Sequence, residues 1–249
     1  MSISIYTKEN QADGNFNYGE ILEKKPIGFP QDGGKLKPYS NLFYWAHAWT
    51  PGTKSTIGLH PHQGFEICSF VLKGNINHFD TKQNKWIPLK EGDVQIIRSG
   101  NGISHAEEID DNSEIFQIWF DPDLSKSLKK EATYDDYSSK DFKLIDKGNR
   151  SFKVIVGEGS PMHMDSENVC INEHYLNEGN HCFNIGIDLI HSYFIIDGEI
   201  ILDNKKLEKG TFFTVSSENE VVFESSETTK IFEIISPLNP SYRTYSQLR

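Results

Sequence analysis

The chain has 249 residues, enough for one large or two ordinary domains, and its 37% hydrophobic content is typical of a folded globular protein. The formal net charge is −11 and the basic residues form no cluster, which disfavours direct binding of nucleic acid. Three cysteines without a CxxC spacing indicate a reducing compartment, and no apolar run approaches the ~18 residues of a membrane span. We therefore expect a cytoplasmic protein without a membrane segment.

Short segments rich in Val, Ile, Phe and Tyr recur along the chain between turns marked by Gly, Asn and Asp. The first half contains FEICSFVLKG, DVQIIRSG and EIFQIWFD, and the second half contains SYFIIDGEIILD, GTFFTVSS and KIFEIIS. Many short strands with frequent turns predict an all-β fold of the sandwich or barrel type.

The first chemically distinctive stretch is IGLHPHQGFE, which places His60 and His62 two residues apart. On a strand, residues with this spacing lie on the same face, and in a closed barrel that face can be the interior. A single pair of this kind is more often a surface or core feature than a pair of metal ligands, so it needs support from elsewhere in the chain.

That support comes from SGNGISHAEE, which places His105 and Glu107 on one face of a later strand. Two strands with two such side chains each could converge on one metal ion. Imidazoles with one carboxylate suit Fe, Mn, Co, Ni, Cu or Zn. Three neutral histidines and one glutamate would leave a divalent ion with a net charge of +1 and open positions for water, dioxygen or a chelating substrate.

The segment DPDLSKSLKKEATYDDYSSKD, residues 121–141, interrupts the strand pattern. It is polar, and Leu124 and Leu128 have the spacing of one helical face, which predicts a linker with one short helix. We therefore expect an N-terminal domain over residues 1–125, a linker over 126–142 and a C-terminal domain over 143–249.

The two expected domains share a repeat. FVLKGNI (70–76) matches FIIDGEI (194–200) at an offset of 124, and LKEGDVQI (89–96) matches LEKGTFFT (207–214) at an offset of 118. Each pair is a strand–turn–strand unit with glycine where a tight turn requires a positive φ. The repeat predicts two copies of one β unit.

The motif HPHQGFE, followed by VLKG, EGDVQ and SGNGISHAE, resembles the pirin family of the cupin superfamily, closely from about Gly58 to Glu107. The resemblance implies two tandem cupin barrels, jelly-roll-like, joined by a short, partly helical linker. It also implies one divalent metal ion in the N-terminal barrel, with Fe(II) favoured and Mn, Co, Ni, Cu or Zn as alternatives. The implied ligands are His60, His62, His105 and Glu107, while Glu66 is expected to orient a histidine.

The resemblance to bacterial pirin-like quercetin 2,3-dioxygenases implies an oxidoreductase that cleaves a flavonol with dioxygen. Glu107 would be the catalytic residue, because a carboxylate ligand can take the flavonol proton. Phe65, Phe70 and Trp119 are candidates to line the substrate pocket. The alternatives are a non-enzymatic metal-dependent regulator or redox sensor that acts through protein partners, and a metal enzyme with another small-molecule substrate.

Several other residues favour structural roles. His78 is expected to be a strand histidine near the rim, and His47 a packed or partly exposed one. Cys68 is expected to be an inert buried thiol that faces the barrel interior. The remaining histidines lack an HxH spacing and are expected to be structural: His163, His174, His181 and His191.

The C-terminal barrel is expected to bind no metal, so that each chain holds one ion. At the offset of 124, His60 and His62 correspond to Asn184 and Gly186. At the offset of 118, His105 and Glu107 correspond to Phe223 and Ser225. None of these four residues is a good ligand for a first-row transition metal.

Overall fold

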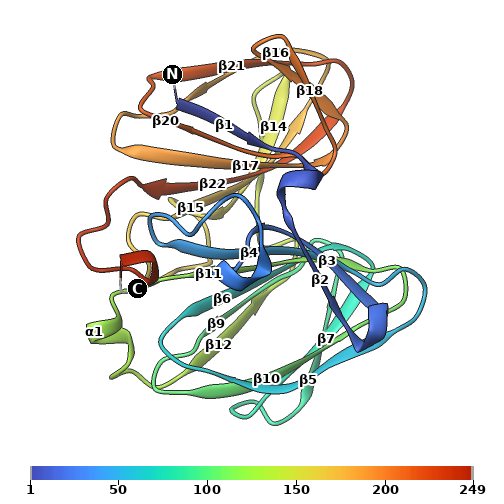
Figure 1. Ribbon diagram of the computed structural model, residues 1–249, viewed down its shortest axis with the longest axis vertical. Coiled ribbons are helices and arrows are strands. Elements are labelled where there is room, and N and C mark those ends of the chain that lie inside the picture. The colour runs from blue at the N-terminus through green and yellow to red at the C-terminus, as the bar shows by residue number, and fades with distance from the viewer. Residues whose placement is uncertain (1, 248–249) are drawn as a thin grey trace. The chain divides into compact units, whose positions relative to one another are not determined.

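The computed structural model describes residues 2–247, and it is built almost entirely of β-strands (Figure 1). The chain forms two compact units. The N-terminal unit comprises Gln11–Asp141 with Tyr242–Arg249, and the C-terminal unit comprises Met1–Asn10 with Phe142–Ser241. The expectation of an all-β fold with two β domains is confirmed. No helix among the described residues is long and apolar enough to cross a membrane.

The N-terminal unit consists of a seven-stranded and a four-stranded sheet. The larger sheet has the order β12-β9-β6-β11-β4-β3-β2, with β2 (Ala12–Phe16), β3 (Ile21–Ile27), β4 (Leu42–Trp49), β6 (Glu66–Lys73), β9 (Val94–Arg98), β11 (Glu114–Phe120) and β12 (Thr133–Tyr137). The smaller sheet has the order β5-β10-β7-β8, with β5 (Ser55–His62), β7 (Asn75–Asp80), β8 (Trp86–Lys90) and β10 (Ile103–Ile109).

The C-terminal unit has the same construction. Its larger sheet has the order β1-β20-β17-β22-β15-β14-β13, with β1 (Ser2–Tyr6), β13 (Leu144–Asp146), β14 (Arg150–Val156), β15 (Cys170–Leu176), β17 (Leu189–Asp197), β20 (Phe212–Ser216) and β22 (Thr229–Pro237). Its smaller sheet has the order β16-β21-β18-β19, with β16 (Gly179–Asn184), β18 (Glu199–Leu202), β19 (Lys205–Glu208) and β21 (Glu220–Ser225).

The short helices are α1 (Leu124–Ser127) and the 3₁₀ turns η1 (Lys8–Asn10), η2 (Asn17–Gly19), η3 (Pro30–Asp32) and η4 (Tyr245–Gln247). Helix α1 starts after Asp123, whose side chain accepts a hydrogen bond from the backbone N–H of Ser125 at 3.1 Å. It lies where the sequence pattern predicts one.

The strand pairing gives the two units equivalent positions. The β6–β7 turn at Gly74 (φ 73°) corresponds to the β17–β18 turn at Gly198 (φ 79°), as the repeat predicts. The pairing also corrects the mapping of the metal-site positions. Ile109 opposite Ile76 corresponds to Ser225 opposite Ile200, so His105 and Glu107 correspond to Val221 and Phe223. The partner of Val221 is Phe183, which therefore corresponds to His60.

The units differ from the expected division at 1–125, 126–142 and 143–249. β1 forms the edge of the C-terminal sheet, where Ser4 lies opposite Thr214 of β20. The expected linker contains β12, which pairs with β9 and completes the N-terminal sheet. Residues from Tyr242 onward return to the N-terminal unit, where the Tyr242 hydroxyl donates to the carbonyl of Asp121 at 2.6 Å.

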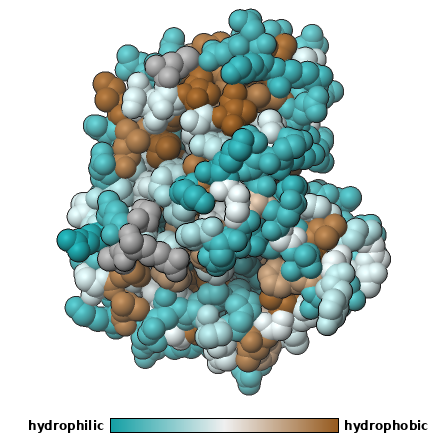
Figure 2. Space-filling view, viewed as in Figure 1, coloured by the Kyte–Doolittle hydropathy of each residue, from teal (hydrophilic) through white to brown (hydrophobic). Residues whose placement is uncertain are grey.

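Each unit encloses its own apolar core. In the C-terminal unit the buried cluster includes Phe183, Tyr193, Phe213 and Phe223. In the N-terminal unit one buried cluster includes Ile76 and Ile109. The face shown in Figure 2 is largely hydrophilic, with small hydrophobic groups between, which is ordinary for a folded protein.

Candidate metal centre

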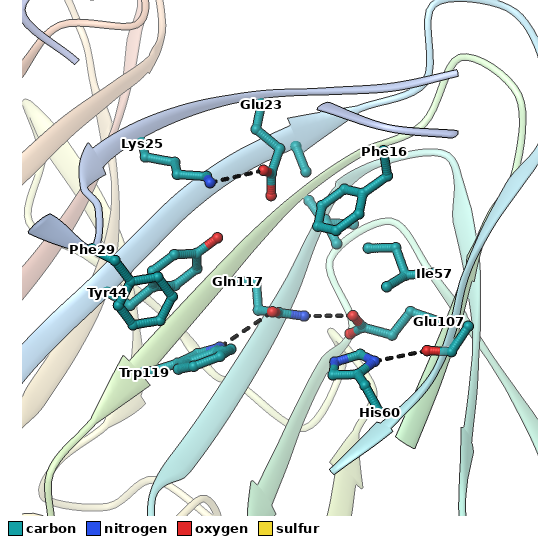
Figure 3. Close-up of a pocket in the computed structure, with 13 residues that line it drawn as sticks. Phe16, Glu23, Lys25, Phe29, Tyr44, Ile57, His60, Glu107, Gln117 and Trp119 are labelled. Atoms are coloured by element: carbon teal, nitrogen blue, oxygen red, sulfur yellow. Dashed lines mark hydrogen bonds and ion pairs between the residues drawn. The ribbon is translucent and has the colours of Figure 1, made fainter. Parts of the chain in front are cut away.

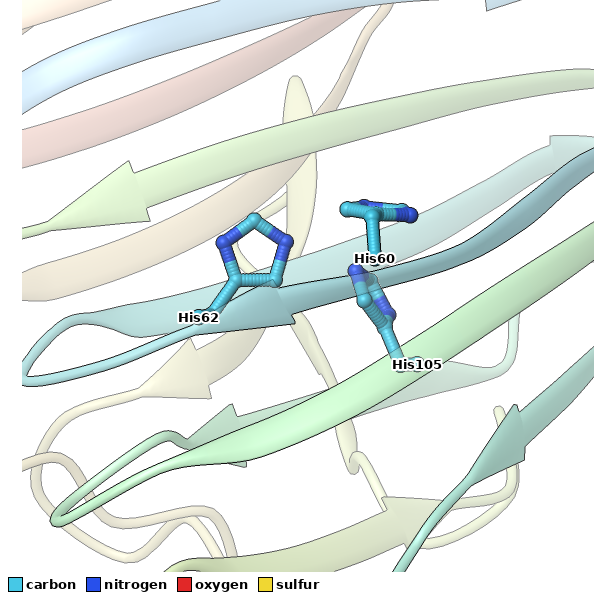
Figure 4. Close-up of side chains that lie close together, drawn as sticks. All are labelled: His60, His62 and His105. Atoms are coloured by element: carbon cyan, nitrogen blue, oxygen red, sulfur yellow. The ribbon is translucent and has the colours of Figure 1, made fainter.

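Three histidines from two neighbouring strands converge inside the N-terminal unit. His60 of β5 lies directly opposite His105 of β10, and His62 follows two residues later on the same face of β5. One ring nitrogen from each of the three lies within 4.8 Å of those of the other two (Figure 4). Within residues 2–247, this is the group of His, Cys, Asp and Glu side chains that could hold a metal ion.

The ring nitrogens of these histidines are short of hydrogen-bond partners. His60 donates from Nδ1 to the carbonyl of Gly58 at 2.8 Å, which leaves its Nε2 lone pair free for another contact. Nε2 of His62 and both ring nitrogens of His105 are buried without a partner among the described residues. Buried polar atoms normally have partners, so these orphaned nitrogens indicate a missing group that accepts lone pairs.

Burial keeps the imidazoles of His62 and His105 neutral. Burial, reinforced by His105 and His60, lowers the pKa of His62 to about 3. Burial, reinforced by His60 and His78, holds the pKa of His105 well below its ordinary value. A neutral imidazole offers a lone pair, which is the form that binds a metal. The residues present therefore fit a divalent transition metal ion.

Glu107 lies beside this group without being one of its members. β10 pairs with β5 through an irregularity, in which His105 is opposite His60 but Glu107 is opposite Ile57. The extra residue is a bulge on β5, and the carboxylate of Glu107, which is fully buried, has other partners. Ser69 donates to its Oε1 at 3.0 Å, and Gln117 donates to its Oε2 at 2.5 Å.

A polar network fixes the Glu107 carboxylate. Trp119 donates from Nε1 to Oε1 of Gln117 at 3.2 Å, so the amide of Gln117 is oriented with its nitrogen toward Glu107. Gln95 donates to the Ser69 hydroxyl at 3.0 Å. Ser69, Gln95 and Gln117 lie opposite one another on β6, β9 and β11. Sequence reasoning missed these residues, although a single polar residue within each apolar strand was the available signal.

A cavity of about 320 Å³ opens beside His60 and Glu107 (Figure 3). Its walls are mainly aromatic and aliphatic, and its polar groups gather in two places, around Gln117 and around Glu23 and Lys25. The lining residues are Phe16, Glu23, Lys25, Phe29, Tyr44, Ala48, Ile57, Gly58, His60, Glu107, Ile115, Gln117 and Trp119.

Of the three aromatic residues expected at the pocket, Trp119 lines the cavity and its ring lies 4.8 Å from that of His62. Phe65 packs instead against Phe43, with ring centroids 4.7 Å apart. Phe70 is buried on β6 directly opposite Phe116, one residue out of phase with the inward-facing Ser69. Neither is among the residues that line the cavity.

The expectation that Cys68 faces the barrel interior was wrong, although the thiol is buried as expected. Ser69 occupies the inward face, so Cys68 points to the other side, where it is fully buried. The alternation of inward- and outward-facing residues along β5 does not continue in phase into β6, because the chain turns between the two strands. Glu66 shares the outer side, where its Oε1 lies 3.7 Å from Nε of Arg98.

His78 is not near the rim as expected but fully buried. Its ring stacks on Tyr134 at 4.6 Å, because β12 from the expected linker covers it, and its Nε2 lies 2.8 Å from Oδ2 of Asp80. The ring centroids of His78 and His105 are 5.8 Å apart. His47 is packed and partly exposed, as expected, with Nε2 3.2 Å from Glu114.

The buried histidines of the C-terminal unit have partners. His174 Nε2 and His191 Nδ1 each lie 2.8 Å from an oxygen of Glu233. His191 Nε2 also contacts the carbonyl of Ile185 at 2.7 Å, and Nε2 of His181 contacts the carbonyl of Asn177 at 2.8 Å. These contacts are those of structural histidines, and His163 is exposed.

Comparison with known proteins identifies relatives of this arrangement. Residues 29–120 match the family model described as Pirin. A candidate quercetin 2,3-dioxygenase of Zymomonas mobilis is 26% identical over 188 residues, which cover 72% of this chain and 75% of that protein. The quercetin 2,3-dioxygenase of Escherichia coli is 38% identical over 70 residues, which cover 27% of this chain and 30% of that enzyme.

Among solved structures, a bacterial pirin from Escherichia coli in complex with nickel(II) has a TM-score of 0.78 at 17% identity. The superposition covers 95% of this chain and 99% of that one. The likeness extends over both units, so it supports the expected bicupin fold for the whole chain.

Proposed function

Residues 29–120 of this chain are a pirin-family domain, and we propose that the chain is a metal-dependent dioxygenase that cleaves a flavonol such as quercetin. In this proposal His60, His62, His105 and Glu107 hold one divalent ion, with Fe(II) favoured. The names of the relatives from Zymomonas mobilis and Escherichia coli support the choice of reaction.

The observation that supports the proposal is that the histidine group and the cavity adjoin each other. Three imidazoles bring ring nitrogens within 4.8 Å of one another, those of His62 and His105 have buried nitrogens without a partner among the described residues, and a cavity with aromatic walls adjoins the group at His60. Small-molecule sites are typically concave and mostly apolar, with a few placed polar groups. The cavity favours an enzyme over a regulator that acts through protein partners, because a small-molecule substrate needs a concave site and a protein partner does not.

A divalent ion at the histidines would act as a Lewis acid and as a template for oxygen atoms. The chain's own residues bind and position the substrate. Trp119 and Tyr44, whose ring centroids lie 4.8 Å apart, form an aromatic wall of the cavity for a planar ligand. Glu107 is the proton acceptor, since its carboxylate lines the cavity and is fully buried. Ser69 and Gln117 hold that carboxylate in place through their hydrogen bonds.

The test combines elemental analysis with the loss of quercetin absorbance under dioxygen. We expect wild-type protein to hold one ion per chain and to consume quercetin and dioxygen together. His60→Ala should lose the ion. Glu107→Gln replaces a carboxylate ligand by a weaker amide, so it should bind the ion less tightly, and at saturating metal it should lose turnover by at least about 100-fold, as is typical for loss of a general base.

His47→Ala is the matched control, because His47 is a partly exposed histidine of the same unit outside the cavity. It should retain both metal and turnover. Quercetin consumption that survives complete removal of metal would contradict the proposal, as would wild-type levels of metal in His60→Ala.

A further inference from the structure

A buried polar pair on β7, formed by His78 and Asp80, lies next to the histidine group and has no role in the proposed reaction. β7 adjoins β10 on the side remote from β5. Asp80 lies opposite His105, and His78 lies opposite Glu107. Both members of the pair are fully buried, and neither is among the residues that line the cavity.

The backbone of the β7–β8 turn fixes the carboxylate of Asp80. The N–H groups of Lys82 and Gln83 each donate to Oδ1 at 2.7 Å. The second oxygen, Oδ2, lies 2.8 Å from Nε2 of His78. Because a carboxylate accepts hydrogen bonds, this contact places the hydrogen of the imidazole on Nε2. In the neutral tautomer that Asp80 selects, Nδ1 of His78 is therefore an acceptor.

This acceptor lies beside a ring that needs one. Nδ1 of His78 is buried without a partner among the described residues, and so are both ring nitrogens of His105. The centroids of the two rings are 5.8 Å apart. Tyr134 stacks on His78 at 4.6 Å with an interplanar angle of 12°, which limits rotation of the His78 ring. If one nitrogen of His105 binds a metal ion, its other nitrogen carries a hydrogen that requires an acceptor.

We propose that His78 is a positioning residue of the metal centre, whose Nδ1 accepts the N–H of the metal-bound His105. Asp80 fixes the tautomer of His78 that makes this hydrogen bond possible. A hydrogen bond of this kind orients the ligating imidazole and raises its basicity. The inference rests on the proposed metal site and is independent of the flavonol reaction.

The experiment titrates the metal-free protein with Co(II) in the absence of dioxygen and substrate, followed by calorimetry and by the visible absorption of the bound ion. The decisive variant is Asp80→Asn. Its amide oxygen still accepts from the N–H groups of Lys82 and Gln83, so its nitrogen donates to Nε2 of His78. The hydrogen of His78 then moves to Nδ1, where it opposes the N–H of His105. We expect Co(II) to bind about 10–100-fold more weakly, with an altered visible spectrum.

Two replacements of His78 separate hydrogen bonding from packing. His78→Asn offers an amide oxygen as an acceptor near the position of Nδ1, whereas His78→Leu offers none. We expect His78→Asn to bind Co(II) more tightly than His78→Leu does. Binding by His78→Asn that is no tighter than binding by His78→Leu would assign His78 a packing role and overturn the inference.

Asp93→Asn is the matched control. Asp93 also accepts two backbone N–H groups, those of Lys90 at 3.1 Å and Ser139 at 3.0 Å, but it is not in contact with a histidine. This variant should bind Co(II) with wild-type affinity. Wild-type affinity and spectrum in Asp80→Asn would overturn the inference and leave the metal site intact. Failure of the wild type to bind Co(II) would overturn the proposed metal site as well.

Discussion

The two units share one strand order, but a cluster of histidines meets a carboxylate in one unit and other histidines in the other. In the C-terminal unit, Glu233 receives both His174 and His191 at 2.8 Å. In the N-terminal unit, the buried nitrogens of His62 and His105 meet no partner among the described residues. Burial alone therefore does not distinguish a ligand from a structural histidine. His174 has a partner at Nε2 although its Nδ1 has none among the described residues, whereas neither ring nitrogen of His105 has one.

Equivalent positions sharpen this contrast. Gln117 opposite Ser69 in the N-terminal unit corresponds to Glu233 opposite Tyr193 in the C-terminal unit. Gln117 donates to Glu107 at the wall of the cavity. Glu233 is enclosed by its two histidines, whose hydrogen bonds overcome the effect of burial and hold its pKa well below the ordinary range. The same fold thus supports an open polar site in one copy and a closed one in the other.

The largest expected difference between the units is in metal binding after one histidine of each unit is replaced by alanine. His105→Ala should weaken metal binding by at least about 100-fold, because a direct ligand matters more than the surrounding residues that typically cost 10–100-fold. His191→Ala should leave the metal content at the wild-type level. Elemental analysis of both variants checks the pair, and equal loss of metal in the two would remove the distinction drawn between the units.

The second comparison concerns stability. Glu233→Ala leaves two buried imidazoles without their shared acceptor and should lower the free energy of unfolding by about 3–5 kcal/mol. Gln117→Ala, the matched change in the N-terminal unit, faces the cavity and should cost about 1 kcal/mol. Denaturant unfolding of both variants measures the difference. Similar losses of unfolding free energy in the two variants would mean that the hydrogen bonds of Glu233 to its two histidines contribute no more to stability than those of Gln117.

A third prediction uses pH. Burial raises the pKa of Asp121 to about 7, although the N–H of Tyr245 donates to it at 2.7 Å. Since this pKa exceeds that of the unfolded chain, the stabilisation is present below about pH 4 and is lost as the pH rises through about 7. The free energy of unfolding of the wild type should therefore fall between pH 5 and 8. In Asp121→Asn, which has no carboxyl group to titrate, this fall should be smaller by about 2–3 kcal/mol.

The equivalent position in the C-terminal unit is Pro237, which has no titrating group. Hydrogen exchange measured across the pH range should therefore locate the Asp121 effect in the N-terminal unit. An identical pH profile in wild type and Asp121→Asn would show that Asp121 titrates at its ordinary pKa.

The smallest expected effect is the one that the two units should share. Gly74→Ala and Gly198→Ala both place a β-carbon at a positive φ and against a neighbouring side chain, Ser113 or Thr229. Each should lower the free energy of unfolding by about 1–2 kcal/mol. Gly33→Ala has a similar φ of 89° but open space around it, so it isolates the backbone strain. A large difference between Gly74→Ala and Gly198→Ala would show that the repeated turns are not equivalent.

Much of the N-terminal unit could be predicted from local patterns. The spacing of His60 and His62 fixes their common face, and the motif around His105 supplies the third imidazole of the observed group. The turns at Gly74 and Gly198 are local features, so the repeat could be recognised. The role of His60, His62, His105 and Glu107 as a ligand set remains a prediction.

The pairing of strands that are far apart in the chain could not be predicted from local sequence patterns. The ungapped offset matches His105 to Phe223, but the connection from β20 to β21 is shorter than that from β9 to β10, so the register moves to Val221. Nothing local indicates that β1 pairs with β20, or that β12 covers His78 through Tyr134. Such pairings depend on which sheet edge is free after folding.

The edge strand β1 also constrains the order in which the protein can be made. Its partner β20 lies more than two hundred residues downstream, so β1 leaves the ribosome long before the strand it must join exists. The segment from Tyr242 onward completes the N-terminal unit in the same delayed way. Each half of the gene therefore encodes a segment of the other half's unit, and separating the halves at the middle of the chain would take the edge strand β1 from the C-terminal unit and the closing segment from Tyr242 onward from the N-terminal unit.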